Sequence, residues 1–395
     1  MKKLAITGLA TLISTAAVAD VQWYGFLKGD VTRTDQMTGN QNATYAKAKG
    51  AAYSNFDKQT QSQMSFRDSR LGAKVGNGSK VSGIIELDFD GQSAKDDSGI
   101  ADSTALQWRQ ANLSYKTENG EFQFGKGYTA FAGLDQHTMQ VNRVGLYQGK
   151  TGFIGDFLGY KHSMGDFSAT LQLGASETSD STGATDVRAN TISNPTNTLR
   201  LDYKWMDHNF GFAYAMATKN LKKSDSTAGV NTFDEDADIT AMKFFGDLNF
   251  GATNVRFEYA QGSNAVGTGW LSKATLASIL PAAAAATPGK LEAVEETAMW
   301  LSAEHTMGKS KVWVRSGVSE ITNADKAGSA FARIAVNSIV KNAVSGIGYS
   351  RELDEGFTVY GEYSMVTTDR LETSSTTDTL SDDGTTLDIG MMYSF

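Results

Sequence analysis

The chain has 395 residues, a formal net charge of −8 and no cysteine. The lack of cysteine excludes a disulfide framework, a thiolate nucleophile and a thiolate metal site, and the acidic balance excludes the basic surface of a nucleic-acid-binding protein. Its 40 Gly and only 3 Pro are suited to many uninterrupted strands, because proline cannot donate a hydrogen bond to a β-ladder.

The first predicted element is a secretory signal peptide at residues 1–19. Two lysines precede an apolar run that ends in Ala-Val-Ala at Ala19, and this order is typical of a signal peptide with its cleavage site. The run is too short for a spanning helix, which needs about 20 apolar residues, and no later run is long enough either. We therefore expect export, with residues 20–395 as the mature protein.

Alternating apolar and polar residues predict β-strands along the rest of the chain. At the C-terminus, Leu387, Ile389, Met391, Tyr393 and Phe395 share one face of such an alternation, which is the period of a half-buried strand. The same period predicts sixteen strands, an even number. They are expected at 22–33, 62–76, 79–90, 105–117, 120–127, 152–162, 165–176, 197–207, 209–219, 238–249, 251–261, 296–307, 309–320, 341–353, 356–368 and 384–395.

The predicted connections alternate between two kinds. Every second one is short and rich in Asn, Asp and Gly, which are residues of hairpin turns. These turns are expected near 77–78, 119–120, 164–165, 207–209, 249–251, 308–309 and 354–356. The others are long and polar, near 34–61, 91–104, 128–151, 177–196, 220–237, 262–295, 321–340 and 369–383. Short turns on one side and long loops on the other are typical of an outer-membrane barrel with both termini in the periplasm.

A soluble β-sandwich or lectin is the alternative, because periodicity alone does not tell a core-facing surface from a lipid-facing one. Sorting of the connections by length favours the barrel. Aromatic residues also lie at strand ends beside the short turns and the termini, where an interfacial girdle belongs. They include Trp23, Tyr24, Trp205, Phe210, Tyr349, Phe357, Tyr393 and Phe395. The predicted fold class is therefore all-β, a transmembrane antiparallel barrel, with a short external helix expected within 271–286.

Five segments in order resemble the trimeric, sixteen-stranded porins of Gram-negative bacteria. They are Trp23 to Gly25 (WYG), Ser69 to Lys74 (SRLGAK), Gly83 to Phe89 (GIIELDF), Trp108 to Leu113 (WRQANL) and Gly120 to Lys126 (GEFQFGK). The terminal Phe395 is similar to the assembly signal of that family. The resemblance implies a homotrimer in outer-membrane lipid and lipopolysaccharide that passes small hydrophilic solutes, with no cofactor and no nucleic-acid partner.

In such porins the third external loop folds back into the lumen and narrows the channel. The resemblance therefore implies the same for residues 128–151. This loop lacks the Pro-Glu-Phe-Gly-Gly-Asp segment of the enterobacterial members. It offers Asp135, Gln136, His137, Gln140, Asn142, Arg143 and Lys150 instead.

The resemblance also implies that Arg70 and Arg109 belong to a basic wall that faces the inserted loop. Alternation places Arg70 inward, whereas Arg109 has the parity of outward residues and needs a β-bulge to turn inward. Glu86 and Asp88 share the inward face of the third strand, and as an opposing acidic wall they would set a transverse field across the opening. The candidate pore-lining residues are Arg70, Glu86, Asp88, Arg109, Lys126, Asp135 and Arg143.

Six further charged residues are expected to line the lumen without a special role. They are Arg200, Lys204, Arg256, Glu258, Arg315 and Glu362. The four histidines show neither a nucleophile partner nor a paired metal-ligand spacing, so neither an enzyme nor a metal site is predicted. The predicted function is passive diffusion through a general porin. A substrate-specific channel and a structural or adhesive barrel with binding loops at 34–61 and 262–295 stay open as alternatives.

Overall fold

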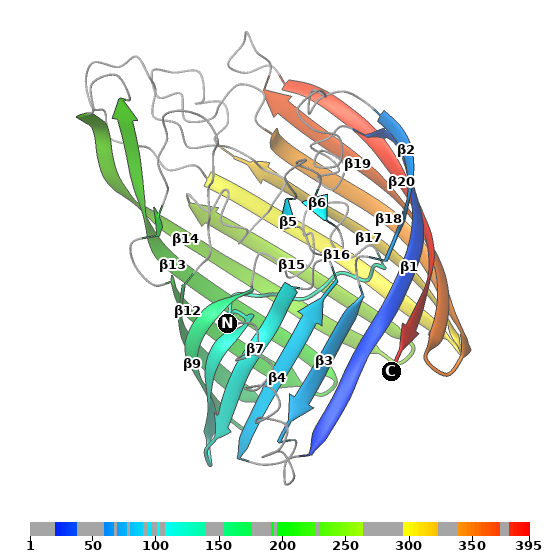
Figure 1. Ribbon diagram of the computed structural model, residues 1–395, viewed down its shortest axis with the longest axis horizontal. Helices are drawn as coiled ribbons and strands as arrows, with labels where there is room; N and C mark the ends of the chain where they lie inside the picture. The colour runs from blue at the N-terminus through cyan, green and yellow to red at the C-terminus, as the bar shows by residue number, and fades with distance from the viewer. Residues whose placement is uncertain are drawn as a thin grey trace.

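The alternating segments form one continuous antiparallel sheet whose first and last strands pair with each other, as the computed structural model shows (Figure 1). The structure describes residues 20–37, 59–66, 69–76, 80–89, 94–95, 101–102, 107–139, 154–175, 191–192, 196–225, 230–263, 295–322, 339–371 and 379–395. Within these ranges no helix is long and apolar enough to cross a membrane.

The first half of the chain contributes the strands up to β12. They are β1 (Val21–Met37), β2 (Gln59–Ser65), β3 (Arg70–Val75), β4 (Val81–Asp88), β5 (Ala94–Lys95), β6 (Ala101–Asp102), β7 (Gln107–Lys116), β8 (Gly120–Tyr128), β9 (Ile154–Met164), β10 (Phe167–Ala175), β11 (Thr191–Ile192) and β12 (Thr196–Trp205). The second half consists of long hairpins. Its strands are β13 (His208–Asp225), β14 (Val230–Phe250), β15 (Thr253–Ser263), β16 (Glu295–Met307), β17 (Ser310–Ile321), β18 (Ile339–Asp354), β19 (Phe357–Leu371) and β20 (Thr379–Ser394).

Eighteen of these strands build the sheet, and they occupy sixteen positions in the wall. β2 and β3 pair one after the other with β1, and β11 pairs with β13 beyond the end of β12. The short strands β5 and β6 form a separate pair. The prediction of a sixteen-stranded antiparallel barrel is confirmed.

Closure of the barrel depends on the two ends of the chain. β1 pairs with β20 from Phe26 opposite Ser394 to Asp35 opposite Thr385. At the rim, Gly25 and Phe395 exchange two backbone hydrogen bonds of 3.1 Å. A Cβ on Gly25 would lie 2.4 Å from the carbonyl oxygen of Arg70, so only glycine fits where the three strands meet. The pairing of β1 with β20 thus closes the sheet on itself.

Tight turns join the strands at one end of the barrel. Two-residue turns lie at 165–166, 206–207, 251–252, 308–309 and 355–356. Their positive φ angles are at Gly165 (59°), Met206 (53°), Gly251 (63°), Gly308 (60°) and Gly356 (74°). Such angles match the twist of hairpin strands and favour glycine. These five turns lie within about two residues of the predicted ones.

Two predicted boundaries are wrong. The strand expected at 62–76 is interrupted between Ser65 and Arg70, where the Ser69 hydroxyl accepts a 3.0 Å hydrogen bond from the backbone N–H of Lys28. The connection expected at 220–237 is mostly strand, because β13 and β14 pair as far as Asp225 opposite Val230 and extend past their neighbours (Figure 1). The helix expected within 271–286 lies outside the described residues.

The two faces of the wall are inverted relative to a soluble sheet. On β14 and β15, the apolar Phe244 and Tyr259 are 52% and 41% exposed, whereas the charged Lys243 and Glu258 next to them are 0% and 2% exposed. Apolar side chains therefore point out of the barrel, and charged ones point into it. A soluble sandwich would bury its apolar face, so this inversion favours the transmembrane barrel.

Candidate functional site

A β-bulge brings Arg109 to the inside of the barrel. Between β4 and β7 the register changes from Glu86 opposite Gln110 to Leu87 opposite Trp108, which leaves Arg109 as the extra residue. The bulge that an inward Arg109 needs is thus present. The Arg109 guanidinium is buried, with Nε 3.0 Å from Glu86 and Nη1 3.0 Å from Asp88. Its Nη2 donates a 2.7 Å hydrogen bond to the hydroxyl of Tyr128.

Arg70 lies beside this cluster, on β3. Its Nε is 3.9 Å from Asp88, and its guanidinium carbon is 5.5 Å from the centre of the Phe26 ring. The expectation of opposed basic and acidic walls is wrong, because Arg70, Glu86, Asp88 and Arg109 lie on neighbouring strands and form one mixed cluster. At 3.0 Å the charge of Arg109 is largely cancelled by Glu86 and Asp88, so the cluster does not set up a field between two opposed walls.

Residues 129–139, which we call the inner segment, follow the inner face of the wall from β10 round to β1. Their hydrogen-bond partners are, in chain order along the segment, Gln172, Arg200, Arg256, Arg315, Ser302, Glu362 and Lys28. These side chains belong to the inward set of their strands. The inner segment therefore lies within the barrel. The remainder of the predicted loop, 140–151, lies outside the described residues, so its course stays a prediction.

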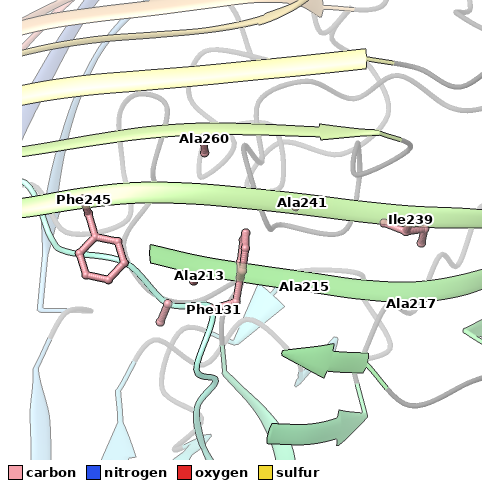
Figure 2. Close-up of a cluster of buried hydrophobic side chains, with 9 residues drawn as sticks. Phe131, Ala213, Ala215, Ala217, Ile239, Ala241, Phe245 and Ala260 are labelled. Atoms are coloured by element: carbon pink, nitrogen blue, oxygen red, sulfur yellow. The ribbon is translucent and has the colours of Figure 1, made fainter. Parts of the chain in front are cut away.

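Phe131 fixes the start of the inner segment on a patch of small residues. Its side chain is 1% exposed and packs in one cluster with Ala213, Ala241 and Ala260 from three adjacent strands (Figure 2). The ammonium of Lys243 lies 4.4 Å from the centre of the Phe131 ring and 3.1 Å from Glu258. Alanine side chains leave room for the ring, and the cation over its face adds to the packing.

Glu362 clamps the far end of the inner segment. Its carboxylate accepts hydrogen bonds from the Thr138 hydroxyl at 2.7 Å and from the Met139 backbone N–H at 2.8 Å. The same carboxylate pairs with Arg315 at 2.9 Å and accepts a hydrogen bond from Trp313 at 3.3 Å. Four donors around one buried carboxylate replace the water that it has lost.

The three remaining candidate residues are Lys126, Asp135 and Arg143. The register places Lys126 opposite Ala111 and Asp156, which are exposed on the same outward face as Phe124, so Lys126 does not belong to the lumen set. Asp135 is exposed on the inner segment, and its carbonyl oxygen accepts a hydrogen bond from Arg256. Arg143 lies outside the described residues.

Several residues that hold the inner segment were missed or undervalued by sequence reasoning. Arg200, Arg256, Arg315 and Glu362 have a specific role, because each bonds to the segment directly. Lys28 is not among the predicted lumen residues, although its alternation with outward Leu27 and Val31 indicates an inward charge. Lys243 gave no clear signal, because its inward neighbours on β14 are themselves apolar.

A closed barrel with outward apolar residues and a charged interior defines a transmembrane channel. A family model described as Gram-negative porin matches residues 5–371, and the chain belongs to this family. It is therefore an outer-membrane channel for small solutes, and the fold is that of non-enzymatic channels.

No curated protein matches the chain significantly. Among solved structures, the outer-membrane channel DcaP of Acinetobacter baumannii is similar, with 18% identity, a TM-score of 0.69, and coverage of 95% of this chain and 97% of that one. The trimer form of OmpT from Vibrio cholerae has 14% identity and a TM-score of 0.56 over 95% and 99% of the two chains. OmpF of Salmonella typhi has 12% identity and a TM-score of 0.56 over 95% and 97%. These likenesses concern the fold.

Replacing Glu362 with Ala is expected to release the inner segment, because Met139 loses its acceptor and Arg315 is left as a buried charge without its partner. Breaking such a pair costs about 3–5 kcal/mol. Hydrogen–deuterium exchange of the peptide that contains 129–139 should accelerate at least about tenfold. Glu320→Ala, which removes the exposed partner of Lys341, is the control. Equal protection in the two variants would contradict the clamp.

Docking of the inner segment is expected to weaken in acid through His137. Its ring lies 3.0 Å from the Ser302 hydroxyl, and burial, followed by the nearby Arg256, lowers the pKa of His137, while Glu304, Asn254 and Asp247 oppose this. His137 therefore binds a proton more tightly when the inner segment is undocked than when it is docked. Docking is thus weakened as the pH falls below about 6.5. Open-channel current noise should rise on acidification, and His137→Asn should abolish the rise. An unchanged pH profile in this variant would exclude His137 as the cause.

Proposed function

We propose that the chain forms a water-filled pore for the passive diffusion of ions and small hydrophilic solutes, and that the inner segment narrows it. One observation carries the proposal: the segment is hydrogen-bonded to inward side chains of seven strands, from β10 round to β1. The part of the wall formed by β3, β4 and β7 would form the other side of the pore opening. Charged groups in such a narrow mouth act on passing ions more strongly than charges on an open surface.

The mixed cluster supplies the wall side of the proposed constriction. Arg70, Glu86, Asp88 and Arg109 would line it, and Asp135 would face it from the inner segment. Arg109 is enclosed by Glu86, Asp88 and Tyr128. Arg70 is held more loosely, with its nearest acidic oxygen at 3.9 Å. Arg70 is therefore the group in this cluster whose charge would act most on passing ions.

Export and assembly are part of the proposal. Residues 1–19 would be the cleaved signal peptide, and the barrel would form a homotrimer in outer-membrane lipid and lipopolysaccharide. The trimeric form of the similar OmpT structure supports the assembly. The backbone pairing of Phe395 with Gly25 supports its role in closing the barrel.

Single-channel recording in planar lipid bilayers tests the pore. Purified protein in KCl is expected to insert with conductance steps that occur in groups of three, and the steps should stay proportional to salt concentration. Absence of conductance would overturn the pore. Single, ungrouped steps would overturn the trimer and leave the pore intact.

Charge reversal at Arg70 is expected to move ion selectivity toward cations. Arg70→Glu places a second carboxylate beside Asp88, and the mouth then attracts cations. The reversal potential in a KCl gradient measures the change. Lys311→Glu is the control, because it changes the charge by the same amount at a residue that already pairs with Glu304 on another part of the wall. An equal shift in both variants would remove Arg70 from the constriction.

A substrate-specific channel is a second candidate, favoured by one observation. A cavity of about 660 Å³ lies between the start of the inner segment and the wall, and this is within the range of small-molecule sites, roughly 300–1,000 Å³.

A further inference from the structure

The cavity of about 660 Å³, which we call the side cavity, has a roof and a floor of different origin. The start of the inner segment, from Thr129 to Leu134, forms the roof. Inward residues of β8, β9, β10, β12, β13 and β14 form the floor. The side cavity is thus a recess of the lumen, open to any solute that enters the proposed pore.

Three of the six charged residues that line the side cavity are already in ion pairs. Arg200 binds Asp202 through three contacts of 2.7–2.9 Å and donates to the Ala132 carbonyl oxygen at 2.7 Å. Asp247 pairs with Arg256 at 3.3 Å. These four groups are held by each other and by the inner segment. They shape the recess and contribute little net charge to it.

Lys161 and Lys204 are two basic residues of the lining that lie outside these ion pairs. Both line the side cavity, and within the described part of the chain neither ammonium has an acidic oxygen within 4 Å. Glu121 is the register neighbour of Lys161 and interacts with both Lys116 and Lys161, but it is not among the residues that line the side cavity. Asp166, in the turn before β10, also lines the recess. The lining thus contains two ammonium groups and one carboxylate outside ion pairs. This balance favours a solute with more negative than positive charge.

The spacing of the two lysines suits an extended solute. Lys161 is opposite Thr170, which is opposite Arg200, and Lys204 follows Arg200 four residues along β12. Two strand spacings and four residues along a strand separate the two Cα atoms by about 16 Å. At this separation, two long, flexible side chains can bind the two ends of one extended small molecule. They are less suited to binding one compact ion together.

Apolar side chains between the lysines point to a solute with a carbon skeleton. Leu134 from the roof and Phe245 from the floor line the recess. Phe245 stands out from β14 in Figure 2. The guanidinium of Arg200 lies 4.7 Å from the centre of its ring. Inorganic phosphate has no apolar surface to bury against these side chains, whereas a hydrocarbon chain has one.

We propose that the side cavity is a binding subsite for small dicarboxylates, with Lys161 and Lys204 each holding one carboxylate. The subsite rests on the proposed pore, through which the solute would reach it. It makes the channel favour such solutes by raising their concentration next to the narrow region. An amino group on the dicarboxylate would be complementary to Asp166.

Succinate-dependent current reduction in planar bilayers tests the subsite. With wild-type protein in KCl, succinate should reduce the current saturably, and its uncharged analogue succinamide and inorganic phosphate should not. In Lys161→Gln/Lys204→Gln the half-saturating concentration should rise by about tenfold or more, since hydrogen bonds between charged groups are lost. Lys311→Gln/Lys309→Gln removes the same charge elsewhere and should leave the value unchanged.

The outcomes separate the subsite from the pore. Normal KCl conductance without saturable reduction by succinate, or an equal effect in the two double variants, would overturn the subsite alone. A phosphate effect as strong as that of succinate would overturn the dicarboxylate class. Loss of all KCl conductance in the wild type would overturn the pore and the subsite together.

Discussion

The constraint on which this structure depends is that a chain in hydrocarbon has no water to bond its backbone. Every N–H and C=O of a spanning segment needs a partner within the sheet, and only a closed barrel supplies one to each strand. The hydrogen bonds between Gly25 and Phe395 complete that closure at the rim. With lipid outside, the alternation of each strand places its apolar residues outward, and the charged residues are necessarily enclosed.

Enclosed charges need partners, and the inner segment supplies many of them. A buried ion without hydrogen bonds is far more costly than one that is paired. Glu362 is neutralised by Arg315 and solvated by the Thr138 hydroxyl and the Met139 N–H. Lys28 in turn donates to the Met139 carbonyl oxygen. The groups that stabilise the wall are therefore the groups that hold the segment, so the width of the lumen and the stability of the barrel are coupled.

The sequence predicts the wall well and the interior poorly. Period-two alternation and turn residues are local signals, and they suffice for sixteen strands and for the turn at Gly308. At Arg109, local parity alone predicts an outward side chain, and the β-bulge is needed to turn it inward as the family resemblance implies. Contacts such as that between Met139 and Glu362 join residues 223 positions apart. They depend on the path of the inner segment, which no local pattern encodes. Lys243 shows the limit of such local signals. The inward face of β14 beside Lys243 carries apolar residues such as Ala241, which packs with Phe131, so the two faces of this strand do not differ in polarity.

Local neutralisation decides which charges can select solutes. A pair such as Arg109 with Asp88 at 3.0 Å acts on a passing ion as a dipole, whose field decays faster with distance than that of a single charge. A lumen rich in such pairs is polar without being strongly selective. Within the described part of the chain, groups outside such close pairs include Arg70, 3.9 Å from Asp88, and the lysines of the side cavity, and these contribute net fields. In the side cavity the two lysines outnumber Asp166, so at this place an acidic protein presents net positive charge to the solute.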